Sequence, residues 1–365
     1  MKDSSLLLVL GSLLAAALFL PGADGRQEWK LKPSDSVNSV HFTVKRSKWG
    51  SNWSTSNDVP LSSFHGLSPD LLAHGGRAKF EYVQDAGRLI CEGSFFWGRG
   101  SGSFTFAPNA QYVSELERLG YEAPDDDQLF SMLMTDVSME FARGVRDAVP
   151  NASTKQLIEL RIHGVTLAYI HEARQAGYED LTAQDYVEMR IHGVETDFLR
   201  DLKSFGYNLQ ARDIVELRIH GVSSEFVGGL KQAGYDLSAK QITELRIHGV
   251  DSEYLRELKS YGLQPGATDL VQLRIHGVSP DYLKGLKDAG YGRLTASEIT
   301  ELRIHGVQTD FIQEAKNLGY NFTPRELVEL GIHGVDGSYL KKLNDTGMKN
   351  LTASQIAKLR IHGVE

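Results

Sequence analysis

Cysteine is almost missing from this chain of 365 residues, which contains Cys91 and no other. A single cysteine excludes an intramolecular disulfide framework. It also argues against a thiolate zinc site, because such sites use several Cys or His ligands at short spacings. The chain is compatible with an oxidising compartment, but this count alone does not establish one.

Positive charge is scarce relative to negative charge. The chain has 39 basic and 47 acidic residues, a formal net charge of −8. This balance lacks the basic footprint of nucleic-acid-binding proteins, so we expect no nucleic-acid partner. Hydrophobic residues make up 41% and charged residues 24%, which is typical of a globular protein rather than a disordered one.

Long apolar runs are absent after residue 20. The one run, LLLVLGSLLAAALFL at residues 6–20, follows Lys2 and is followed by Pro21. It is shorter than the roughly 20 residues that span a bilayer, and small residues at Ala23 and Gly25 suit a cleavage site. Residues 1–25 are therefore predicted to be a signal peptide cleaved near Gly25, with a retained anchor as the alternative. The mature chain is expected to be secreted or periplasmic, without a membrane span.

The region from residue 27 to residue 107 is rich in Gly, Ser and aromatic residues. In residues 78–106, AKFEYVQDAGRLICEGSFFWGRGSGSFTF, apolar and polar residues alternate between glycine-containing turns. VHFTVK (40–45) and NWSTSNDV (52–59) look like further strands. Alternation broken by such turns predicts an antiparallel meander. We expect one small antiparallel β domain, a sandwich or a roll.

A histidine within the motif LRIHGV then recurs every 28 or 29 residues. The histidines are His163, His192, His220, His248, His276, His305, His333 and His362. A fixed period in this range indicates a repeat array. An aromatic residue recurs with the same period from Tyr112 to Tyr339, which brings the expected number of repeats to nine, the first two degenerate.

The expected repeat region covers residues 109–365. Its repeats are expected at 109–137, 138–165, 166–194, 195–222, 223–250, 251–278, 279–307, 308–335 and 336–364.

Each repeat contains two segments with the same plan, shown by DSEYLRELKSYGL and SAKQITELRIHGV. Each segment has a capping residue, apolar residues at helical spacing, and a glycine after the last turn. Helices of about ten residues are marginal alone, so stacking must stabilise them. The predicted fold is mainly α: a small β domain followed by a right-handed α-solenoid of about nine helix-turn-helix repeats.

The LRIHGV motif fits a helix ending in a Schellman motif. His248 would be the C-cap and Gly249 the left-handed residue after it, with a hydrophobic contact between Leu245 and Val250. Arg246 suits the negative end of the helix dipole. The glycines expected to act as structural caps are Gly164, Gly193, Gly221, Gly249, Gly277, Gly306, Gly334 and Gly363.

The eight histidines are the candidate binding residues, and two hypotheses remain for them. The first is that they are surface C-cap residues of an interaction scaffold. The second is a metal- or small-ligand-binding sensor that uses the histidine row. Equivalent residues in stacked repeats are roughly 8–10 Å apart, whereas two ligands of one zinc ion each lie about 2 Å from it. This distance favours the first hypothesis.

The β-region sequence DAGRLICEGSFFWGRGSGSFTF, combined with SEYLRELKSYGL and ITELRIHGV, resembles a bacterial arrangement. It is similar to the extracytoplasmic C-terminal region of some membrane metallopeptidases of the antibiotic-sensing, β-lactam sensor-transducer type. The similarity spans residues 27–365, but the membrane helices and the zinc motif of the peptidase are missing. The resemblance implies a free-standing accessory or sensing region from a bacterium, with no catalytic residue carried over.

From these features we expect a non-catalytic scaffold that needs no cofactor and no bound metal. Solenoids present extended surfaces with little chemistry of their own. The expected partner is a protein, a peptide or a cell-envelope component. The last repeat has no polar closing helix after Val364, so self-association through that repeat is a further expectation.

Overall fold

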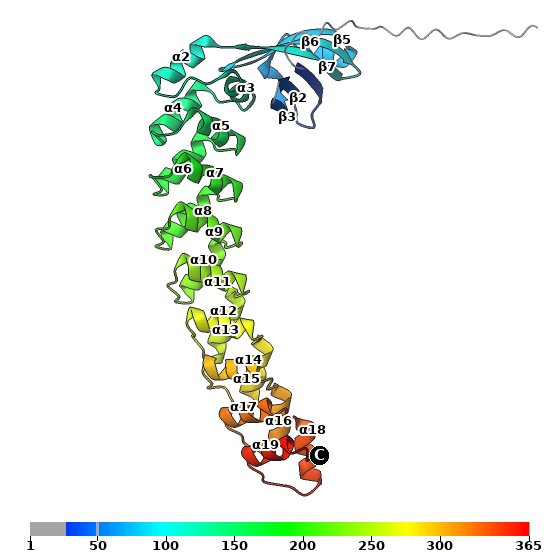
Figure 1. Cartoon of the computed structure of the whole chain (residues 1–365), viewed down its shortest axis with the longest axis vertical. Coiled ribbons are helices and arrows are strands. Elements are labelled where there is room, and N and C mark those ends of the chain that lie inside the picture. Colours follow the sequence, from blue (N-terminus) through cyan, green and yellow to red (C-terminus); the bar gives the residue numbers. More distant parts are fainter. Residues whose placement is uncertain (1–26, 49–50, 365) are drawn as a thin grey trace, which may run out of the picture. The chain divides into compact units, whose positions relative to one another are not determined.

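The computed structural model describes residues 27–48 and 51–364 (Figure 1). The expected signal peptide, residues 1–25, lies outside the described residues. The chain divides into two compact units. The first runs up to Asp147 and includes Asn151–Arg161, while the second consists of Ala148–Pro150 and the chain from Ile162 onward.

A seven-stranded antiparallel sheet forms the N-terminal part of the first unit. Its strands are β1 (Gln27–Pro33), β2 (Ser39–Lys48), β3 (Ser51–Pro60), β4 (Phe64–His65), β5 (Gly76–Gln84), β6 (Gly87–Phe96) and β7 (Arg99–Pro108). The strand order is β3-β2-β1-β7-β6-β5-β4. A 3₁₀ turn, η1 (Leu61–Ser63), and a short helix, α1 (Pro69–His74), connect β3 to β5. The predicted meander corresponds to β5, β6 and β7.

The sheet is strongly curled. In a flat sheet, β2 and β5 would lie four strand spacings apart, roughly 19 Å. However, the ring centroids of Phe42 on β2 and Tyr82 on β5 are 5.5 Å apart. Trp29 on β1 packs edge-on against Phe80 on β5, at a centroid distance of 4.9 Å. The β domain is therefore a rolled single sheet, and the two-sheet sandwich alternative is excluded.

Alternation along each strand creates an apolar inner face and a polar outer face. On β1, Trp29 and Leu31 are buried, whereas Lys30 and Lys32 between and after them are exposed. The inner face also buries Cys91 completely, and this burial raises the pKa of its thiol far above the ordinary value. The single cysteine is thus an apolar core residue rather than a reactive one.

Helix α3 (Asp126–Met134) packs on the sheet within the first unit. The ring of its Phe130 contacts Trp53 and Phe104, at centroid distances of 4.9 and 5.9 Å. The buried guanidinium of Arg46 on β2 lies 4.6 Å over Phe130 and pairs with Asp126. Helix α3 therefore shares a core with the sheet.

Helices of nine or ten residues occupy the rest of the described chain. They are α2 (Ala110–Arg118), α3, α4 (Met139–Ala148), α5 (Thr154–Ile162), α6 (Leu167–Gln175), α7 (Ala183–Ile191), α8 (Thr196–Ser204), α9 (Ala211–Ile219), α10 (Ser224–Gln232), α11 (Ala239–Ile247), α12 (Ser252–Tyr261), α13 (Ala267–Ile275), α14 (Pro280–Asp288), α15 (Ala296–Ile304), α16 (Thr309–Asn317), α17 (Pro324–Ile332), α18 (Gly337–Asp345) and α19 (Ala353–Ile361).

Stacking in the second unit follows the repeat period. Each even-numbered helix from α6 to α18 packs on the next even-numbered helix, and each odd-numbered helix from α7 to α19 on the next odd-numbered one. The unit therefore consists of two parallel layers of helices (Figure 1). The predicted fold class, a β domain followed by a helical solenoid repeat, is confirmed. No helix in the described residues is long and apolar enough to cross a bilayer.

Candidate functional site

Each odd-numbered helix from α7 onward ends with the same hydrogen bonds. In α11, the N–H of Val250 donates to the carbonyl of Leu245 at 2.9 Å, and the N–H of Gly249 donates to Arg246 at 3.1 Å. This pair of bonds defines the Schellman motif. The eight glycines that follow the histidines have φ between 66° and 73°, a region that residues with a side chain rarely adopt. Leu245 and Val250 are fully buried.

The histidines of the motif lie at the surface. His163, His192, His220, His248 and His362 are exposed, and His276, His305 and His333 are half-exposed. No group of three or more His, Cys, Asp or Glu side chains in the described part of the chain is placed to hold a metal ion. The structure therefore leaves the histidine side chains available at the surface without gathering them into a site.

The residue before each histidine forms a row that the sequence analysis did not single out. These residues are Ile162, Ile191, Ile219, Ile247, Ile275, Ile304, Ile332 and Ile361. Each is between 51% and 59% exposed. Large exposed apolar side chains in the described residues number eleven, and eight of them belong to this isoleucine row. All eight lie in the second unit.

The motif itself contained a signal for this row. Leu245 and Ile247 are two residues apart on a helix, so they point about 200° away from each other. Leu245 is buried as part of the Schellman motif, and the same layer cannot bury both side chains. Helical geometry therefore turns the second apolar residue of LRIHGV toward solvent.

A carboxylate accompanies most histidines at a fixed offset, which the sequence analysis also missed. Glutamate stands four residues before six of the eight histidines, at Glu159, Glu188, Glu216, Glu244, Glu301 and Glu329. Gln272 and Lys358 stand at the other two positions. These glutamates are four residues before the histidine and three before the isoleucine. Residues three or four apart share a helix face, so an acidic row runs beside the isoleucine row.

The arginine of the motif links its own repeat to the preceding one. The Nε of Arg246 donates to the carbonyl of Gly221 in the preceding repeat at 3.1 Å, and its guanidinium lies 5.5 Å from the ring centroid of Phe226. Seven arginines stack in this way on the recurrent aromatic of their own repeat. The arginine is therefore explained by packing, whereas the exposed isoleucine is not.

The outer face of the sheet carries a second group of polar residues. Asp58 Oδ1 lies 2.9 Å from Nδ1 of His41, and Ser56 Oγ lies 2.7 Å from Nε2 of the same ring. Thr43 Oγ1 is 2.6 Å from Ser56 Oγ. The hydrogen bond with His41, and then one with Ser34, hold the pKa of Asp58 below its ordinary value.

The order Asp58–His41–Ser56 is that of a hydrolase triad, but its setting differs. In such triads the carboxylate is buried, where it orients the imidazole. The side chain of Asp58 is 47% exposed, and it lies directly opposite His41 on paired strands. A cross-strand polar network of this kind stabilises an exposed strand pair. We therefore assign these residues to holding β2 and β3 together.

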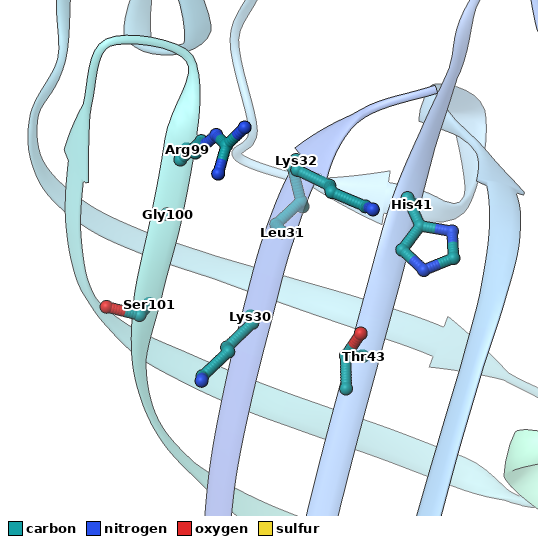
Figure 2. Close-up of a pocket in the computed structure, with 8 residues that line it drawn as sticks. All are labelled: Lys30, Leu31, Lys32, His41, Thr43, Arg99, Gly100 and Ser101. Carbon is teal, nitrogen blue, oxygen red and sulfur yellow. The ribbon is translucent and has the colours of Figure 1, made fainter. Parts of the chain in front are cut away.

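A shallow pocket of about 420 Å³ lies beside this network, across β7, β1 and β2. Figure 2 shows Arg99, Lys32 and His41 side by side on these three strands, with Lys30 on the next row. Thr43 and Ser101 contribute hydroxyls. The pocket is thus lined by cations and hydrogen-bond donors, which suits an anion rather than an apolar ligand.

Comparison with known proteins adds no assignment to these two surfaces. No protein-family model matches the chain, and no curated protein sequence matches it.

Proposed function

We propose that this protein is a non-catalytic interaction scaffold of the extracytoplasmic space and that the isoleucine row is its binding surface. The partner would be a protein or peptide of the cell envelope. The observation that carries the proposal is the half-exposed isoleucine at the same position of eight repeats.

Neither helix formation nor solubility favours isoleucine at this position. A β-branched residue has a lower helix propensity than lysine or arginine, and a cation would suit the dipole at the end of the helix. Exposed apolar side chains that recur at one position of stacked repeats are candidates for an interaction surface. Burying the remaining half of one isoleucine contributes about 1 kcal/mol, so a partner that covers several of them gains substantial affinity.

The acidic row defines the charge of the partner. Glu216 and Glu244 are exposed beside Ile219 and Ile247. Opposite charges across an interface steer association and exclude wrong partners. The proposed partner therefore presents apolar side chains flanked by lysine or arginine.

The resemblance to the accessory region of antibiotic-sensing metallopeptidases supports the same proposal. The resemblance implies a location outside the cytoplasm of a bacterium, and the apolar segment at residues 6–20 fits the same proposal. The mass of the exported chain tests this part, because cleavage near Gly25 leaves a product that begins at Arg26. Export of the uncleaved chain would contradict it.

The binding surface is tested by capture from a bacterial envelope extract. Immobilised wild-type protein is compared with the triple variant Ile219→Glu, Ile247→Glu, Ile275→Glu. We expect at least a tenfold loss of captured partner, measured by quantitative mass spectrometry. The matched control replaces the same three residues by valine, which keeps the row apolar and should retain the partner.

The sensor hypothesis, in which the histidine row binds a metal or a small ligand, is tested with a histidine variant beside the isoleucine variants. Because a carboxylate near a helix C-terminus is itself unfavourable, thermal melting of both isoleucine variants separates a changed binding surface from a loss of stability. If His220→Ala, His248→Ala and His276→Ala together abolish binding of zinc or a small ligand while Ile→Glu does not affect capture, the histidine row is the functional one.

A further inference from the structure

The three remaining exposed apolar residues lie at one end of the sheet. Phe96 is 75% exposed, Trp97 84% and Val37 87%. Phe96 and Trp97 stack on each other at a centroid distance of 5.6 Å, and we call them the aromatic tip. Val37 lies in the connection between β1 and β2, which reaches the same end because Pro33 lies next to Gly98. Among the described residues of the first unit, the large exposed apolar side chains therefore lie at this end of the sheet.

The turn that carries the aromatic tip does not require a tryptophan. β6 and β7 are joined by Trp97 and Gly98, both with positive φ, 50° and 75°. This is the pattern of a type I′ hairpin, which prefers Asn, Asp or Gly at its two central positions. A bulky residue at positive φ is uncommon and strained. The tip thus places the largest apolar side chain at a position where both conformation and solvation disfavour it.

Positive charge is concentrated in the outer-face rows next to this tip. Phe96 pairs with Arg99 across the hairpin, and Lys32 on β1 lies beside Arg99 and opposite His41 (Figure 2). In the next row, Lys30 lies opposite Ser101. We call Lys30, Lys32 and Arg99 the cation cluster. None of the three forms an ion pair within the described residues, although the Asp58 carboxylate interacts electrostatically with Lys32. Like charges on facing positions of a sheet repel each other.

Negative charge lies mainly farther from the tip. The third outer-face row contains Glu28 and Glu92, both paired with Ser103. Near the tip the carboxylates are Asp35, in the connection before Val37, Asp58, which is hydrogen-bonded to His41, and Asp70 on α1, the helix whose Leu72 carbonyl lies close to Gly98. Residues 27–108 have nine basic and seven acidic side chains, a net of +2, while residues 109–365 have 28 and 38, a net of −10. The cationic end is therefore a local feature of an acidic protein.

We propose that this end of the sheet docks on a membrane surface that contains anionic phospholipid. The aromatic tip and Val37 enter the interface, where tryptophan is favoured because one part of its ring system is apolar and one part can hydrogen-bond. The cation cluster binds the lipid phosphates, with Ser101 and Thr43 as further donors. An apolar tip with cations beside it on the outer face of the sheet suits such a surface better than a soluble anion, which would leave the tip in water.

The test uses the chain from residue 26, which keeps every described residue and removes the apolar segment at residues 6–20. Binding is measured by co-sedimentation with phosphatidylcholine vesicles that contain half phosphatidylglycerol, and with pure phosphatidylcholine vesicles. We expect binding to the anionic vesicles that weakens as salt rises, and at least tenfold weaker binding to the neutral ones. A blue shift of tryptophan fluorescence on vesicle addition should accompany it.

The decisive variant is Trp97→Asn, because asparagine suits the left-handed turn position and the hairpin should fold at least as well as in the wild type. We expect the affinity for anionic vesicles to fall at least tenfold and the blue shift to disappear. Lys30→Gln, Lys32→Gln and Arg99→Gln together should weaken binding by roughly fivefold per cation. The matched control, Lys45→Gln, Lys79→Gln and Arg88→Gln, removes three charges elsewhere on the sheet and should bind like the wild type.

Three outcomes would overturn the proposal. Equal binding to neutral and anionic vesicles would exclude a role for the cation cluster, and an equal loss in the matched control would reduce the effect to net charge. If Trp97→Asn binds vesicles normally and millimolar inorganic phosphate competes for the cluster, the site takes a soluble anion instead of a lipid surface.

Discussion

The sheet and the helical repeats expose apolar surface in opposite ways. In the repeats, one isoleucine per repeat is exposed, so that the same position occurs eight times along the chain. On the sheet, the exposed apolar residues are Phe96 and Trp97 at the β6–β7 turn and Val37 in the β1–β2 connection, which lie at the same end of the strands. A surface formed by the same position of every repeat follows the period of the sequence. A surface formed at a single place depends on which strands become neighbours. Periodicity in the sequence therefore reveals where such a surface lies only for the repeats.

The charged groups of the two regions also arise in these two different ways. The acidic row of the repeats comes from one motif position, Glu four residues before His. The cation cluster combines residues of β1 and β7. These residues are about 70 positions apart in the sequence and become neighbours through strand pairing. The following predictions test how independent the two regions are.

The largest expected effect is Trp29→Ala. Trp29 is 1% exposed and packs on Phe80 and Phe95 inside the roll, so its truncation should cost about 3–5 kcal/mol. Because Cys91 is the single, buried cysteine, its alkylation rate reports opening of the first unit, and far-UV circular dichroism follows the helices. Alkylation should accelerate while most of the helical signal unfolds as before. An equal shift of both signals would show one cooperative unit.

Leu245→Ala is the matching change in the repeats. The side chain is fully buried at the helix end, and its loss should cost about 2–5 kcal/mol. Here the denaturation curve followed by circular dichroism should shift, with the alkylation rate of Cys91 unchanged. Faster alkylation would contradict the independence of the two regions.

A smaller effect is expected for Gly221→Ala. Gly221 has φ of 70°, and a Cβ there would meet no atom within 4 Å, so the cost is conformational and about 1–2 kcal/mol. Gly221→Asn is the control, since asparagine tolerates this conformation, and it should cost less. Urea denaturation measures both. Equal losses of stability for alanine and asparagine would show that the left-handed backbone conformation does not cause the effect.

The smallest effect concerns the titration of Asp58. Its pKa is lowered from 3.8, first by the hydrogen bond with His41 and then by one with Ser34. A carboxyl with a lowered pKa stabilises the folded state above 3.8, and this contribution disappears as the pH falls through the lowered value. Carbon-detected NMR should show the pKa of Asp58 rising toward 3.8 in His41→Ala. An unchanged pKa would remove His41 as the cause.

Much of the helical region could be predicted from local sequence. The capping boxes at Ser238 and Thr295 occur in the structure as the pattern indicates. Asp136, with φ of 55°, replaces the glycine in a degenerate copy, and no glycine signal marks it. Helical geometry also implies the isoleucine row, but within LRIHGV the residue type that suggests chemistry is the neighbouring histidine.

The outer face of the sheet could not be predicted in the same way. Strand alternation indicates that Lys30 and Lys32 share a face, but not that Arg99 lies beside them. The network of His41, Ser56 and Asp58 likewise depends on the register of β2 and β3. A shift of one residue would turn every one of these side chains to the other face.

Sequence alone determined where most helices of the repeats begin and end, because caps, glycine ends and the period of apolar residues act within a few residues of each other. It also determined that the array repeats. Tertiary structure decided that the single sheet curls around its own aromatic core. It also decided that cations of β1 and β7 lie close to an exposed tryptophan. Those contacts join distant residues, and only the pairing and curl of the strands select them.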